Sequence, residues 1–81
     1  MIKILVVVTL KDDVLDPQGK VIHQTLNGIG FENIHEVRQG KYFEISIKET
    51  DKTKAEAKVE DMCKKLLANL VIEDFKIIGS Q

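Results

Sequence analysis

Two histidines and one cysteine are the residues of this chain best suited to catalysis or metal binding. His23 lies in a predicted helix, and His35 lies beside Glu36 in an extended segment. A catalytic or metal-binding histidine needs a second group at a defined spacing, and the sequence gives neither histidine one. Cys63 has no neighbouring base, so we interpret it as a small buried apolar residue. We therefore predict no catalytic residue and no metal site.

Two Gly-Lys pairs raise the question of a phosphate-binding loop. A Walker loop requires a second glycine five residues before the Gly-Lys pair, and neither Gly19-Lys20 nor Gly40-Lys41 has one. No P-loop is therefore predicted, and we expect no cofactor to bind to the chain itself.

Nucleic acid is also excluded as a predicted partner. Acidic residues alternate with the lysines of the second predicted helix, which is typical of a solvated helix face. On an open sheet of the RNA-binding kind, Tyr42 would stand beside Glu44, whose carboxylate repels phosphate. The 12 basic and 13 acidic residues give a net charge of −1. The chain as a whole therefore has no excess of positive charge with which to attract nucleic acid.

Length and composition indicate one folded domain over residues 1–81. The hydrophobic fraction is 43%, which is typical of a globular domain. The apolar run at residues 4–8 is much shorter than the roughly 20 residues that a membrane-spanning helix needs. A lone cysteine is typical of a reducing compartment, so the sequence favours a cytoplasmic protein without a membrane segment.

Hydrophobic periodicity predicts six elements that would position the polar residues. Strands are expected at residues 2–10, 33–39, 41–48 and 72–78. Helices are expected at residues 17–29 and from Thr53 to about Leu70. Asp16 is predicted to cap the first helix with Pro17 at its first position, and Thr53 with Glu56 to form a capping box for the second.

This element order predicts an α+β fold, a ferredoxin-like β-α-β-β-α-β sandwich with an antiparallel sheet and both helices on one face. The other face of such a sheet is open. Leu5, Val7 and Tyr42 would lie on that open face, and we assign them to a homodimer interface.

Gly40 leaves two paths for the chain between the middle strands. Gln39-Gly40 is a weak hairpin signal compared with Asn-Gly or Asp-Gly. Val37 shares the odd parity of Phe43 and Ile45, so the segment can equally run straight through Gly40 as one ribbon. The straight path would send the second strand to another copy, in a dimer or higher oligomer.

Polar residues gather at two junctions, KDDVLDPQGK and RQGKY. Turn and cap chemistry accounts for Asp16, Pro17 and Gly40 without a ligand. It leaves Arg38 and Lys41 unexplained, so we interpret these two as contacts with something outside the chain.

The stretch VTLKDDVLDPQGKVIHQTLNGIGF, followed by VRQGKYFEI, closely resembles the small PurS subunits of phosphoribosylformylglycinamidine synthase. The resemblance covers essentially the whole chain, and residues 15–19 and 38–41 carry it by their order and spacing. It implies a cytoplasmic, non-catalytic subunit of an enzyme of purine biosynthesis.

The resemblance also implies the partners. In such enzymes a large synthetase subunit uses ATP and Mg, a glutaminase subunit releases ammonia, and the small subunit helps the two associate so that ammonia passes between them. Family dimers are thought to exchange the first helix and second strand. The residues that we assign to contacts with the partner subunits are Lys11, Asp16, Pro17, Gln18, Gly19, Arg38, Gly40 and Lys41.

A second family remains as an alternative. Regulatory ACT domains share the β-α-β-β-α-β topology, and DPQGKVIHQTLNGIGFENI also resembles their loop, helix and glycine. In that case the chain would sense a small molecule such as an amino acid at a dimer interface.

Overall fold

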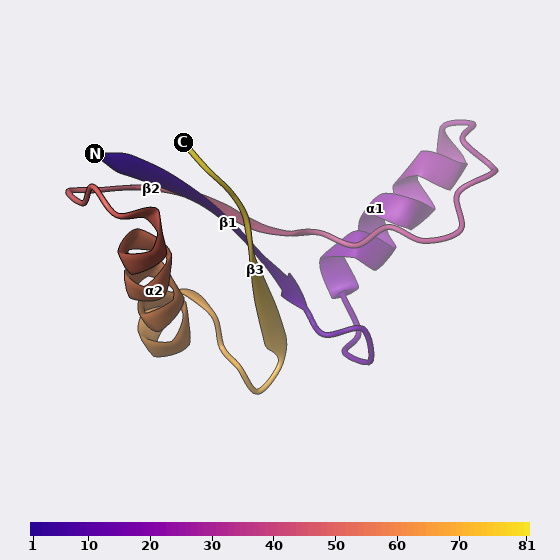
Figure 1. Ribbon diagram of the computed structural model, residues 1–81. Coiled ribbons are helices and arrows are strands. Elements are labelled where there is room, and N and C mark those ends of the chain that lie inside the picture. Colours follow the sequence, from indigo (N-terminus) through magenta and orange to yellow (C-terminus); the bar gives the residue numbers. More distant parts are fainter.

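The body of the protein is a three-stranded antiparallel sheet (Figure 1), seen in a computed structural model that describes residues 1–81. The central strand β1 (Ile2–Leu10) pairs with β2 (Gly40–Ile47) on one side and with β3 (Glu73–Ser80) on the other. β-Branched residues dominate β1 and suit a strand with neighbours on both edges. The predicted α+β class and antiparallel sheet are confirmed.

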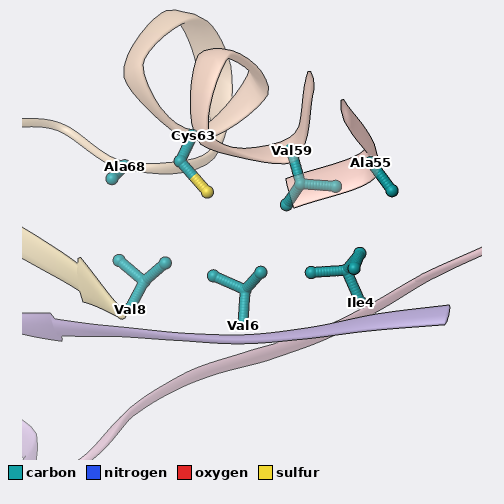
Figure 2. Close-up of a cluster of buried hydrophobic side chains, with 7 residues drawn as sticks. All are labelled: Ile4, Val6, Val8, Ala55, Val59, Cys63 and Ala68. Atoms are coloured by element: carbon teal, nitrogen blue, oxygen red, sulfur yellow. The ribbon is translucent and has the colours of Figure 1, made fainter. Parts of the chain in front are cut away.

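The core lies between one face of β1 and the helix α2 (Lys52–Met62). Ile4, Val6 and Val8 are fully buried and point toward Ala55, Val59 and Cys63 (Figure 2). The two-residue period of the strand and the four-residue spacing on the helix bring these two sets face to face. Cys63 is a buried core residue, as the sequence indicated.

The second helix differs from its prediction at both ends. Its N-cap is Asp51, whose carboxylate accepts from the N–H groups of Thr53 and Lys54, so the expected capping box at Thr53 is wrong. Beyond Cys63 the helix widens into one π-helical turn, η1 (Cys63–Leu67). The wider turn directs Leu67 toward the core and leaves Leu66 82% exposed.

The first helix, α1 (Pro17–Gly28), stands away from the sheet (Figure 1). The expectation that both helices cover one face of the same sheet is therefore wrong for a single chain. The radius of gyration is 16.0 Å, against about 12 Å for a compact domain of this length. Only 9 of 81 residues are buried, because much of the apolar surface has no cover within the chain.

The chain passes straight through Gly40. Residues 31–39 are extended but pair with no strand, and they lead directly into β2 (Figure 1). The predicted strand at residues 33–39, and with it the four-stranded sheet, is therefore wrong for a single chain. Of the two paths left open at Gly40, the structure has the straight one. Gly40 pairs with Thr9, and a Cβ there would overlap the carbonyl oxygen of Val8.

The sheet face opposite α2 is open. Leu5 and Val7 are half-buried, and Tyr42, the cross-strand partner of Val7, is 53% exposed. The Tyr42 hydroxyl donates to Oε2 of Glu44 over 2.9 Å, and this bond raises the pKa of Tyr42. The three residues assigned to a homodimer interface thus lie on one uncovered face. No helix has the length and apolarity to cross a membrane.

Truncation of the core should cost far more than truncation outside it. Ile4→Ala removes a fully buried side chain and should lower the free energy of unfolding by about 3 kcal/mol. Val71→Ala, where the side chain is 83% exposed, should change it by less than about 0.5 kcal/mol. Urea denaturation at one protein concentration measures both, and equal effects would contradict this description of the core.

Candidate functional site

The polar residues of the two junctions meet at one place, where the loop between β1 and α1 crosses the entry to β2. We call residues 11–19 and 38–41 the hinge, because the rest of α1 and residues 29–37 join the sheet only through them. The two motifs are therefore in contact in the fold, although they stand far apart in the sequence.

Asp16 ties the two halves of the hinge together. The N–H of Gly19 donates to its Oδ1 over 2.9 Å, which caps α1, and the N–H of Gln39 donates to its Oδ2 over 2.8 Å. Pro17 occupies the start of the helix, where a missing N–H costs nothing. The predicted cap is confirmed, and the bond to Gln39 is an additional role.

These bonds act on the acidity of Asp16. The N–H of Gln39, then that of Gly19, lowers the pKa of the carboxyl group below its ordinary 3.8, and the positive charge of Arg38 adds to this effect. Burial of the side chain, which is 6% exposed, opposes the shift but does not reverse it. Asp16 is therefore an ionised structural acceptor, unsuited to delivering a proton near neutral pH.

Arg38 makes the reciprocal connection. Its Nη2 donates to the carbonyl oxygens of Lys11 and Val14, each over 2.9 Å, and approaches that of Leu10 at 3.5 Å. A guanidinium suits this task because it stays charged and offers several donors from one plane. The side chain that the sequence left unexplained thus holds the loop of its own chain.

The first turn of α1 packs tightly on the extended segment. A Cβ on Gly19 would overlap the carbonyl oxygen of Val37, so only glycine permits this approach. The side-chain amide of Gln39 also donates to Oε1 of Gln18. All these contacts join α1 to the segment that leads into β2.

Two lysines line the outer side of the hinge. Nζ of Lys11 lies 2.6 Å from Oδ1 of Asp74, and Nζ of Lys41 lies 3.5 Å from Oε2 of Glu73. Their side chains remain 36% and 57% exposed, so both are available to a partner. Glu73 and Asp74 could not be identified from residue types alone, because their contacts depend on the position of β3 beside β1.

The eight residues assigned to partner contacts therefore gather at the hinge, whereas Leu5, Val7 and Tyr42 lie apart on the open face. One further contact was missed. Nε2 of His23 lies 2.8 Å from the carbonyl oxygen of Ile34 and ties α1 to the returning segment. Any donor can reach a backbone carbonyl, so residue types alone did not indicate this bond.

The structure contains no group of three or more potential metal-ligating side chains and no buried side-chain polar atom without a partner. Burial raises the pKa of the Cys63 thiol, and the charge of Glu60 adds to this, so the protonated thiol is favoured.

The family model described as PurS, phosphoribosylformylglycinamidine (FGAM) synthase, matches residues 3–81. The chain belongs to the PurS family. The PurS subunit of the Bacillus subtilis (strain 168) synthase is 43% identical over 94% of this chain and 89% of its own length. That of Methanocaldococcus jannaschii is 44% identical over 95% of this chain and 93% of its own length. The match favours PurS over the ACT alternative.

Solved PurS structures share the fold. The match to the crystal structure of Methanocaldococcus jannaschii PurS spans 100% of this chain and 96% of that protein's chain, at 43% identity and a TM-score of 0.90. A chain in the structure of PurLQS from Thermotoga maritima covers 100% and 96%, at 24% identity and a TM-score of 0.84. Because the first match covers the whole chain, the position of α1 away from the sheet belongs to the PurS fold.

Asp16→Asn should flatten the dependence of stability on acid. The folded pKa of Asp16 is lowered, so the unfolded chain binds the proton first and stability falls as pH drops below about 4. The amide keeps one acceptor for Gly19 but turns an NH₂ toward Gln39. The midpoints of urea denaturation, measured between about pH 7 and pH 2, give the pH dependence of stability for both proteins. An equally steep loss in the variant would contradict the role of Asp16.

Two glycines of the same helix offer a matched pair. Gly19→Ala should destabilise the protein by about 1–3 kcal/mol, because the methyl group meets a backbone oxygen that cannot rotate away. Gly28→Ala meets no atom within 4 Å and should stabilise by about 0.4–1 kcal/mol. Thermal unfolding at one protein concentration gives both values. A harmless Gly19→Ala would show that the helix does not pack on Val37.

Proposed function

We propose that this chain is the small subunit of phosphoribosylformylglycinamidine synthase in purine biosynthesis, and that it acts there by assembly, without an active site of its own. The enzyme converts formylglycinamide ribonucleotide to its amidine with ATP and glutamine. Family membership supports the enzyme. Methanocaldococcus jannaschii PurS, whose structure this chain matches, is one of the subunits of formylglycinamide ribonucleotide amidotransferase in the purine biosynthetic pathway.

One observation carries the assembly role: α1 and the residues that follow it expose apolar side chains and cover no part of the sheet of their own chain. Val21 is 59% exposed, Ile29 67% and Phe31 57%. Burying such side chains is worth roughly 1.5–3 kcal/mol each, so a partner surface is strongly favoured. A contiguous apolar patch of this kind is typical of a protein interface.

The first partner in this proposal is a second copy of the chain. Residues 33–39 pair with no strand of their own chain and enter β2 in line, so they suit the open edge of β2 in another copy. α1 of that copy would then cover the sheet beside α2. The exchanged dimer supplies the fourth strand and the second helix that the sequence predicted for each sheet.

The other partners are the large synthetase subunit and the glutaminase subunit. The name PurLQS of the Thermotoga maritima structure supports a complex of three kinds of subunit. We assign ATP and Mg to the large subunit, and the release of ammonia to the glutaminase. The small subunit holds the two in register so that ammonia passes between them, which is a positioning role. The complex is assigned to the cytoplasm.

We divide the eight hinge residues into two groups for this proposal. Asp16, Gly19, Arg38 and Gly40 contact the backbone of the chain and shape the hinge. The contacts that we assign to the partners are Lys11, Pro17, Gln18 and Lys41, whose exposed or partly exposed side chains make no hydrogen bond to the backbone of the hinge.

Reconstitution with the two partner subunits tests this proposal. Omission of the chain should abolish glutamine-dependent synthesis of the amidine while leaving the reaction driven by added ammonium salt, because only the passage of ammonia is lost. The double variant Lys11→Ala/Lys41→Ala should weaken binding to the partners about 10-fold, the effect of losing charged contacts at an interface.

Lys58→Ala provides the matched control. Lys58 pairs with Glu49 over 3.2 Å on the far side of the molecule, and its loss should leave the affinity unchanged. Full glutamine-dependent activity without the chain, or turnover by the chain alone, would contradict the assembly role.

A further inference from the structure

Residues 20–37, which comprise most of α1 and the returning segment, form a unit that we call the arm, and the hinge alone sets its direction. The arm extends beyond the end of the sheet (Figure 1). Within it, the bond between His23 and the carbonyl of Ile34 joins the helix to the returning segment. The arm therefore moves as one body, and only its base decides where it points.

Two connections run through that base, and each holds the other. Asp16 lies on the outgoing connection and accepts from the N–H of Gln39 on the returning one, over 2.8 Å. Arg38 lies on the returning connection and donates to the carbonyls of Lys11 and Val14 on the outgoing one, each over 2.9 Å. Both bonds involve a charged group, so both are stronger than bonds between neutral groups.

The alternative to this open form is an arm folded back onto its own sheet. In that form the chain would reverse at Gly40, and residue 38 would lie on the outer side of β2. Two strand spacings would then separate Arg38 from β1, a distance of about 10 Å. Neither the bond from Gln39 to Asp16 nor the bonds from Arg38 to the loop would survive such a reversal.

An arm makes the same contacts with a sheet whether that sheet is its own or belongs to a second copy. Only the hinge differs between a closed single chain and an exchanged dimer, so hinge contacts decide between them. We propose that Asp16 and Arg38 form a lock that selects the open form and retards the exchange of arms between copies. This inference rests on the exchanged dimer of the proposed function.

The experiment mixes dimers made with ¹⁴N and ¹⁵N and follows mixed species by native mass spectrometry, with sedimentation of the same samples. In Arg38→Ala the exchange rate should rise about 10-fold or more, because hydrogen bonds to a charged group stabilise by at least that factor. Arg38→Ala/Gln39→Asn, which also creates an Asn-Gly turn at residues 39–40, should sediment as a single copy.

Two further variants keep the result interpretable. Lys58→Ala removes a surface ion pair away from the hinge and should exchange at the native rate. Arg38→Lys keeps the positive charge on a side chain with a shorter reach. Its exchange rate should lie between those of the native protein and Arg38→Ala. The lysine variant replaces the alanine variant if the latter does not fold.

The outcomes separate the lock from the function on which it rests. Native exchange rates in both Arg38 variants, with an intact dimer in the double variant, would overturn the lock and leave the assembly role standing. A native protein that sediments as a single copy would overturn the exchanged dimer and the lock with it.

Discussion

A three-stranded sheet with one helix on it leaves apolar surface uncovered, and this deficit governs the rest of the structure. An α-helix is about 10 Å wide and covers little more than two strands spaced about 4.8 Å apart. α2 therefore buries Ile4, Val6 and Val8 of the central strand, whereas Phe43 and Ile45 of β2 stay half-exposed. The helix that would complete the layer, α1, belongs to the same chain and points away from it.

The direction of α1 depends on polar contacts at a few residues. Gly40 permits β2 to start against Val8, and Gly19 permits the helix to rest on the extended segment. Asp16 and Arg38 then bind the backbone on opposite sides of the crossing. These contacts determine which surfaces of the molecule remain exposed.

Much of the structure could be predicted from the sequence, because it depends on local rules. The alternation of apolar residues in β1 predicted which side chains form the core. Asp16 followed by Pro17 predicted where α1 begins. The path through Gly40 could not be decided, because Val37 has the same parity as Phe43 and Ile45 and the turn signal at Gln39-Gly40 is weak. Nor could the task of Arg38 be found, because its acceptors are backbone carbonyls and every residue carries one. The π-helical turn after Cys63 left no signal in residue type.

The exposed arm also has a consequence for the life of the protein in the cell. A single copy exposes Ile29 and Phe31, and only 9 of its 81 residues are buried. In the exchanged dimer that we propose, another copy would cover these side chains. Segments with so few buried contacts open readily and are cut first by proteases. Surplus subunits are thus expected to be short-lived, so that degradation matches their supply to the number of complete enzymes.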